Sequence, residues 1–339
     1  MQYRTLGRTG IKVSPYALGA MMFATAMGNA PEESVRIIHR ALDAGINFVD
    51  TADAYADSEE IVGRALQGRR DSVVLATKVG RPVDDDLNHR GASRRWIMKA
   101  VENSLRRLQT DYIDLYQIHR PDPDTDIEET LSALTDLVRS GKVRAIGTST
   151  MPASDIVEAQ WVAERRGLER FQTEQPPYSI LNRGIESEVL PTAQRHGMTA
   201  IVWAPLGQGM LTGRVRKGEQ NDLRRARFSK HLTDERRIDV VEQLIPLAAE
   251  AGLPMTHLAM AFTIAHPSVT SALLGPRTME HLDNLLAGAD VALSDDILDR
   301  IDEIVPPGTD VTRLDQAYAP PAVLNPNLRR RPAVERSAA

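Results

Sequence analysis

The chain has 339 residues, of which 42% are hydrophobic and 26% are charged, a mixture typical of a globular protein with enough apolar material for a core. Its formal net charge of −5 argues against a general surface for nucleic acid or for an anionic membrane. The absence of cysteine excludes disulfides, cysteine nucleophiles and thiolate metal sites.

Short β-branched runs alternate with longer amphipathic segments along most of the chain. Residues 2–14 are typical of two short strands around Gly7–Gly10, which predicts a hairpin that caps the bottom of the fold. Eight further strands are predicted at Tyr16–Ala20, Asn47–Thr51, Val73–Lys78, Ile113–His119, Val143–Thr148, Phe171–Glu174, Ala200–Ala204 and Ser271–Leu274. Helical patterns lie at Glu32–Ala44, Ser93–Leu108, Ile127–Ser140, Ala153–Arg166 and Ile185–His196, and Asp295–Val305 reads as an extra C-terminal helix.

The alternation of strands and helices predicts an α/β fold with a parallel sheet. Eight such units without a long linker favour a closed (β/α)8 TIM barrel over an open sheet. We expect a single domain over residues 1–310 and a tail over residues 311–339 whose last residues are disordered. Residues 207–233 form an unusually long connection, and such loops inside a compact domain are usually functional.

Titratable side chains stand at the ends of three consecutive predicted strands. Asp50 and Tyr55 lie in FVDTADAY, Lys78 ends VVLATK, and His119 ends DYIDLYQIH. Each residue alone is more often structural than functional. Parallel strands of a barrel bring their carboxyl ends to one face, however, where barrel enzymes have their active sites. The four residues together therefore predict an active site.

These four side chains suit the reduction of a carbonyl group by a hydride. The carbonyl oxygen must receive a proton, and a tyrosine phenol, with an ordinary pKa of about 10, donates it more readily beside an ammonium. Lys78 can supply that charge to Tyr55, and Asp50 can hold Lys78 in place. His119 can donate a hydrogen bond that orients and polarises the carbonyl oxygen. None of these tasks needs a metal.

Several segments together resemble the aldo-keto reductase family, across roughly residues 2–306. They are FVDTADAYADSEEIVGRAL, VVLATKVG, LRRLQTDYIDLYQIHRPD, VRAIGTST, FQTEQPPYSIL, VWAPLGQGMLTGR and LLGPRTMEHL. The resemblance implies a (β/α)8 barrel, NADPH or less often NADH as cofactor, and a catalytic tetrad. The tetrad maps onto Asp50, Tyr55, Lys78 and His119. HRPD after the fourth strand resembles the bacterial branch of the family, which is related to potassium-channel beta subunits.

The resemblance also implies a cofactor groove without the GxGxxG fingerprint, which follows no strand here. Ser149, Thr150 and Gln172 would bind the nicotinamide carboxamide, although the family usually has Asn at the position of Thr150. Trp203 would stack on the nicotinamide ring. The complete set expected at the cofactor is Gly19, Met21, Asp50, Ser149, Thr150, Gln172, Trp203, Ala204, Pro205, Leu206, Gly207, Gly209, Arg214, Gly275, Arg277, His281 and Asn284.

Gly275-Pro276-Arg277-Thr278 opens a helix after the eighth strand, and a helix N-terminus with an arginine is a natural phosphate site. We therefore expect Arg277 to bind the 2′-phosphate of NADPH, which favours NADPH over NADH. His281 and Asn284-Leu285 depart from the residues usual in the family. Arg224, Arg225 and Arg227 either clasp the cofactor or form a solvated basic loop.

The predicted substrate pocket contains Met22, Phe23, Tyr55 and His119, although the residues Met21–Phe23 also suit plain core packing. The leading hypothesis is an NADPH-dependent reductase of aldehydes or ketones, also capable of alcohol oxidation. The alternative is a nicotinamide-binding sensor or regulatory subunit with negligible turnover, while a metal-dependent hydrolase is disfavoured because no HxH cluster ends a strand. We expect a cytoplasmic monomer or weak homo-oligomer that contacts neither nucleic acid nor membrane, since no secretory signal or membrane-spanning run is apparent.

Overall fold

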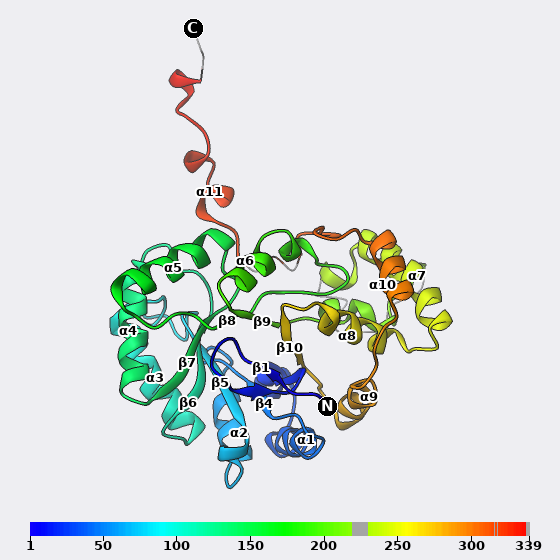
Figure 1. Cartoon of the computed structure of the whole chain (residues 1–339), viewed down its shortest axis with the longest axis horizontal. Helices are drawn as coiled ribbons and strands as arrows, with labels where there is room; N and C mark the ends of the chain where they lie inside the picture. The colour runs from blue at the N-terminus through cyan, green and yellow to red at the C-terminus, as the bar shows by residue number, and fades with distance from the viewer. Residues whose placement is uncertain (219–229, 315, 317, 337–339) are drawn as a thin grey trace.

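Eight parallel strands close into a barrel that is surrounded by helices (Figure 1). This computed structural model describes residues 1–218, 230–314, 316 and 318–336. The strand order around the barrel is β10-β3-β4-β5-β6-β7-β8-β9. Their bounds are β3 Tyr16–Gly19, β4 Phe48–Asp50, β5 Val74–Val79, β6 Ile113–Ile118, β7 Val143–Thr148, β8 Thr173–Glu174, β9 Thr199–Val202 and β10 Val269–Leu274. The predicted (β/α)8 barrel is confirmed.

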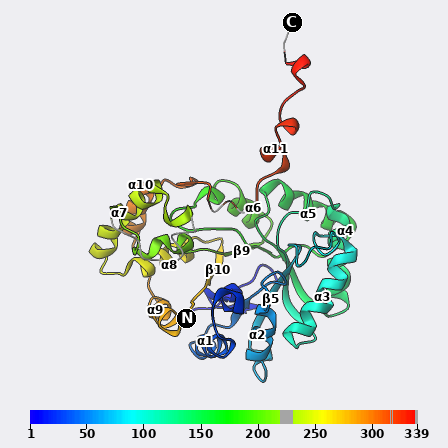
Figure 2. The same cartoon turned by 180° about the vertical axis from the view of Figure 1, so that it is seen from behind.

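Helices cover the outside of the barrel, as the two opposite views show (Figures 1 and 2). They are α1 Pro31–Asp43, α2 Ser58–Ala65, α3 Arg94–Leu108, α4 Ile127–Arg139, α5 Ala153–Arg166, α6 Val189–Arg195, α7 Glu235–Glu250, α8 Met255–Ala265, α9 Met279–Ala287 and α10 Asp295–Ile304. One further short helix, α11 Pro321–Leu324, lies away from the barrel. The helix predicted over Ile185–His196 is instead a short 3-10 turn followed by α6. Pro191 fits the shorter helix, because it lies in the first turn of α6, where a proline removes no helical hydrogen bond.

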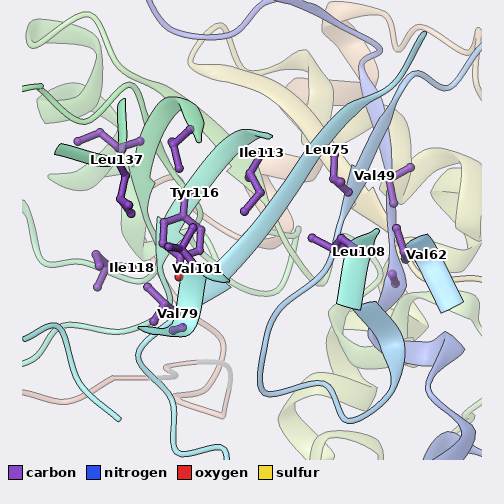
Figure 3. Close-up of a cluster of buried hydrophobic side chains, with 14 of the residues drawn as sticks. Val49, Val62, Leu75, Val79, Val101, Leu108, Ile113, Tyr116, Ile118 and Leu137 are labelled. Carbon is purple, nitrogen blue, oxygen red and sulfur yellow. The ribbon is translucent and has the colours of Figure 1, made fainter. Parts of the chain in front are cut away.

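The core has two layers because buried parallel strands present apolar side chains on both faces. Outward-facing residues such as Val49 and Leu75 pack among helix residues such as Val62 and Leu108 (Figure 3). A second cluster fills the barrel itself, and it contains Leu6, Val13, Ala17, Phe48, Ala76, Leu115, Ala145, Ile201 and Leu273. The barrel is therefore a packed core that supports a site only at its ends.

The N-terminal hairpin closes the bottom of the barrel, as predicted. Strands β1 (Arg4–Thr5) and β2 (Lys12–Val13) pair antiparallel. Leu6 and Val13 are fully buried against the barrel interior. The hairpin turn is fixed by two hydrogen bonds, from the Gly7 amide to Thr199 Oγ1 at 3.0 Å and from the Arg8 amide to Gln172 Oε1 at 3.1 Å. With the bottom closed, only the face at the carboxyl ends of the strands remains for a site.

The predicted extra helix is α10. The chain beyond it has two parts, one that packs on the body and one that does not. Residues up to Thr312 contact the barrel, where the Val311 amide donates to the Leu181 carbonyl at 3.0 Å. The segment with α11 then projects away from the body (Figures 1 and 2). Within the described ranges, no helix is long and apolar enough to cross a membrane.

Candidate active site

The predicted titratable residues converge at the carboxyl-terminal mouth of the barrel. Asp50 ends β4, Lys78 lies near the end of β5 and His119 directly follows β6. Tyr55 stands in the loop between β4 and α2, and its amide donates to the Ala52 carbonyl at 3.1 Å. Asp50, Tyr55 and His119 line one cavity, and Lys78 lies buried beside them with 1% of its surface exposed.

Asp50 and Lys78 form a buried ion pair. Lys78 Nζ donates to Asp50 Oδ1 and to the Thr51 carbonyl at 2.9 Å. The side-chain amides of Gln117 and Gln175 donate to Asp50 Oδ2 at 3.0 and 2.9 Å, so both carboxylate oxygens are satisfied. Burial alone disfavours the Lys78 ammonium, but the charge of Asp50, and then Tyr55, outweigh it and raise the pKa of Lys78. Lys78 is therefore a fixed positive charge.

Tyr55 lies between this charge and His119. Its hydroxyl is 3.4 Å from His119 Nε2, and the two rings meet edge to face with centroids 5.5 Å apart. Lys78 Nζ is 5.2 Å from the centroid of the Tyr55 ring. The Tyr55 hydroxyl thus has an ammonium behind it and an imidazole beside it.

His119 is held as a neutral imidazole. Burial, followed by the positive charges of Lys78, Arg120 and Arg81, keeps the pKa of His119 well below its usual range. Its Nδ1 atom is buried and has no hydrogen-bond partner among the described residues. A neutral imidazole beside a phenol can donate one hydrogen bond to an oxygen atom in the cavity without competing as an acid.

A single cavity of about 640 Å³ extends from these residues to the start of α9. This volume is in the range of small-molecule and cofactor sites. The residues predicted for the cofactor that line it are Gly19, Met21, Asp50, Ser149, Trp203, Ala204, Pro205, Leu206, Gly209, Arg214, Gly275, Arg277, His281 and Asn284. Met22, Tyr55 and His119, predicted for the substrate, line it as well.

The far end of the cavity is cationic. Thr278 caps the N-terminus of α9, and its hydroxyl accepts from the His281 amide at 3.2 Å. Burial and the nearby charges of Arg214 and Arg277 lower the pKa of His281, against the opposite effect of Glu280. Two guanidinium groups and a helix N-terminus therefore converge where an anion can bind.

Gln172 does not line the cavity, contrary to the prediction from the sequence. It lies at the opposite end of the barrel, where its Oε1 accepts from the Arg8 amide of the hairpin and its Nε2 donates to the Arg170 carbonyl at 3.3 Å. The glutamine at the cavity is Gln175, which follows β8. Gln172 precedes β8 and therefore lies at the bottom of the barrel, whereas Gln175 follows β8 and lies at the mouth.

Three other predicted residues stand back from the cavity wall. Phe23 is fully buried in the outer core, which bears out its alternative interpretation as a packing residue. Gly207 is buried, and its carbonyl accepts from Arg237 Nη2 at 2.9 Å. Thr150 adopts a positive φ of 58°, and its amide donates to the Gln175 carbonyl at 3.2 Å. Arg224, Arg225 and Arg227 lie outside the described residues.

Sequence reasoning missed several residues of the cavity wall. Besides Gln175, these include Arg81, Arg120, Gln208, Thr212, Thr256 and Glu280. Their positions in the sequence could have indicated them, because Arg81 comes soon after β5 and Arg120 directly follows His119. Residues that follow barrel strands face the mouth of the barrel whatever their type.

Comparison with known proteins agrees with this geometry. A sequence model of the aldo/keto reductase family matches residues 16–306. The chain belongs to the aldo/keto reductase family. Among the similar proteins, some are named as oxidoreductases and others as potassium-channel subunits.

Two similar proteins come from Bacillus subtilis (strain 168). The "Uncharacterized oxidoreductase YrpG" is 38% identical over 333 residues, which cover 94% of this chain and 100% of that protein. The "Aldo-keto reductase YhdN" is 38% identical over 302 residues, covering 84% and 88%. A "Probable voltage-gated potassium channel subunit beta" of Arabidopsis thaliana is 35% identical over 323 residues, covering 90% and 97%.

Proposed function

We propose that this aldo/keto reductase is an NADPH-dependent reductase of aldehydes or ketones, with Tyr55 as the proton donor. The observation that carries the proposal is the position of the Tyr55 hydroxyl at the cavity, 3.4 Å from His119 Nε2 and next to the buried Lys78–Asp50 pair. The same groups serve the reverse oxidation of an alcohol, because a proton donor in one direction is the acceptor in the other.

Each of the four side chains has a defined task in this proposal. Lys78 favours release of the phenolic proton because its positive charge stabilises the phenolate of Tyr55. Asp50 holds Lys78 charged and in place. His119 donates a hydrogen bond to the carbonyl oxygen, which orients the substrate and stabilises the negative charge that develops there.

The residues of the cavity fit a phosphorylated dinucleotide. NADPH, when bound, supplies the hydride. Trp203 lines the cavity with an indole Nε1 that has no partner among the described residues. Ser149 Oγ and the Gln175 amide lie on the same wall, near the proposed nicotinamide position. At the far end, Arg277, Arg214 and the N-terminus of α9 supply the donors that phosphate oxygens need.

Replacement of the proton donor tests the reaction. Tyr55→Phe is expected to keep NADPH affinity and to lose at least about 100-fold in kcat, the usual contribution of a positioned acid. The measurements are the oxidation of NADPH with a small aldehyde, followed by absorbance, and NADPH binding by fluorescence. Undiminished turnover in Tyr55→Phe would show that Tyr55 is not the proton donor.

The same assay separates the reductase from the second candidate, a nicotinamide-binding sensor. The similarity to a named channel subunit favours that candidate, while the complete tetrad favours the enzyme. Tight NADPH binding without turnover of any aldehyde or ketone would favour the sensor. One chain supplies every residue of the proposed site, so we expect it to work as a monomer or weak homo-oligomer.

The choice of cofactor depends on Arg277. Arg277→Ala is expected to weaken NADPH binding about 10- to 100-fold while leaving NADH binding nearly unchanged, because only NADPH carries the 2′-phosphate. Dissociation constants of the two cofactors, measured by fluorescence titration, give the comparison. Equal weakening of both cofactors would place Arg277 elsewhere on the dinucleotide.

A further inference from the structure

Two arginines stand at the reactive end of the cavity, away from the cationic end at α9. Arg81 follows β5, Arg120 follows His119, and both line the cavity with Tyr55. We propose that Arg81 and Arg120 bind an anionic group, a carboxylate or a phosphate, on the carbonyl substrate. This proposal rests on the proposed reductase function and names the substrate class of that same site.

Arg120 is held in place by the site itself. Its Nη1 donates to the His119 carbonyl and to Ser149 Oγ, the latter at 3.2 Å. Burial lowers the pKa of the Arg120 guanidinium and the charge of Arg81 lowers it further, while Tyr55 acts in the opposite direction. Guanidinium nevertheless stays charged in proteins, so Arg120 presents a fixed cation beside the reacting groups.

Arg81 completes the pair from the neighbouring strand. Its side chain is exposed at the mouth of the cavity. Its charge contributes to the lowered pKa of both His119 and Arg120, which places it within electrostatic reach of the reacting groups. Two like charges thus face the same space, an arrangement that an anion between them would relieve.

Neither of these two charges is held in an ion pair within the part of the chain that the structure describes. None of its ion pairs includes Arg81 or Arg120. Asp50 is engaged by Lys78, and Glu280 lies at the α9 end. Glu174 is fully buried and interacts electrostatically with Arg120; burial raises its pKa to about 7, against its hydrogen bonds from Thr148 and Met151, so at neutral pH it carries only part of a negative charge. Two guanidinium charges therefore outweigh one partly ionised carboxyl, and the reactive end of the cavity has a net positive charge.

This positive charge is not needed for the cofactor phosphates. Arg214, Arg277 and the start of α9 already provide cationic groups at the other end. Arg81 and Arg120 instead adjoin Tyr55 and His119, where the carbonyl group of a substrate must lie. Guanidinium forks match carboxylate and phosphate oxygens, so the substrate class is an aldehyde or ketone with an acidic group near its carbonyl.

The test compares matched substrates that differ in charge. One pair is 4-carboxybenzaldehyde and its neutral methyl ester, and the other is glyceraldehyde 3-phosphate and glyceraldehyde. With saturating NADPH, kcat/KM is measured for the parent and for Arg81→Ala, Arg120→Gln and Arg95→Ala. Arg95 is exposed on α3 and lines no part of the cavity, so Arg95→Ala controls for the loss of one positive charge.

We expect the parent and Arg95→Ala to prefer the anionic member of at least one pair by about tenfold or more, and that pair distinguishes carboxylate from phosphate. Arg81→Ala and Arg120→Gln should lose most of this ratio. Equal or better use of both neutral members by the parent, or an unchanged ratio in both variants, would overturn the proposal.

Absence of turnover with all four substrates would instead contradict the proposed reductase. The anion site is then judged by calorimetry with benzoate and inorganic phosphate. Weaker binding of either anion to Arg81→Ala than to Arg95→Ala supports the site. Equal binding to these two variants, or none to the parent, overturns it.

Discussion

Among single residues, Asp53 has a buried carboxyl group that keeps its proton to a higher pH than an exposed one. It lies in the loop that leads to Tyr55, with 7% of its surface exposed, and its amide donates to the Lys78 carbonyl at 3.1 Å. Burial, together with the charge of Glu59, raises the pKa of Asp53 to about 8, against the smaller effect of Arg107. An unfolded chain would release this proton near pH 4.

This shift predicts how stability depends on pH. Between about pH 4 and pH 8 the folded state keeps a proton that the unfolded state has lost, so the contribution of Asp53 to stability falls as the pH rises. Asp53→Asn mimics the protonated acid. Relative to the parent, its free energy of unfolding should therefore increase from pH 5 to pH 8, by at most about 1.4 kcal/mol per pH unit.

Urea unfolding at the two pH values measures this difference. Asp111→Asn removes the same charge from an exposed position and serves as the control. The prediction fails when the difference in free energy of unfolding between Asp53→Asn and the parent is the same at pH 5 and pH 8. It also fails when this difference changes with pH by as much in Asp111→Asn.

His119 gives a second prediction at the same scale, for activity. Burial and the charges of Lys78, Arg120 and Arg81 hold its pKa well below the usual value near 6.5, so the imidazole stays neutral when the pH falls through that range. We expect kcat/KM for aldehyde reduction to show no loss from imidazole protonation between pH 7.5 and pH 5.5. A titration near pH 6.5 that disappears in His119→Gln would contradict the burial argument.

Among the elements, β8 shows what the sequence could and could not specify. The sequence predicts a strand over Phe171–Glu174, and the strand is there, although β8 itself comprises only Thr173–Glu174. Gln172 lies at the hairpin end and Gln175 at the cavity end. Hydrophobic pattern locates a strand, whereas the end at which a flanking polar residue faces a site depends on where pairing begins and stops.

The two glutamines give a matched experiment. Gln175→Leu removes one of two amides that donate to Asp50 Oδ2, and hydrogen bonds to buried charges contribute about 1.5–3 kcal/mol. We expect roughly a tenfold or greater loss in kcat, since Asp50 then holds Lys78 less firmly. Gln172→Leu loosens the hairpin turn instead, and should lower the melting temperature with little change in kcat. Steady-state kinetics and thermal unfolding of both variants test this, and similar kinetic losses in the two would contradict it.

For the whole molecule, the barrel was predictable because eight strand–helix units leave few ways to bury their apolar faces. The convergence of Asp50, Lys78 and His119 was predictable for the same reason, since they lie at the carboxyl ends of successive strands that share one face. Arg81 and Arg120 were not, because an arginine after a strand is ordinary until its neighbours in space are known. The path of the chain after α10 likewise depends on contacts between distant segments.

That path predicts two different outcomes of truncation. The Gly184 amide donates to Asp310 Oδ1 at 2.9 Å and the Val311 amide to the Leu181 carbonyl at 3.0 Å, whereas the described residues beyond 319 are almost all exposed. A chain ending at residue 319 should keep the melting temperature of the full chain within about 2 °C.

A chain ending at residue 308 loses these hydrogen bonds and the burial of Thr312, which is 4% exposed. At about 1 kcal/mol for each hydrogen bond, the free energy of unfolding of this chain should be roughly 2–3 kcal/mol lower than that of the full chain. Thermal and urea unfolding of the three chains provide the test. Loss of stability already at residue 319 would mean that the projecting segment packs on the barrel, and equal stability at 308 would mean that these contacts contribute nothing.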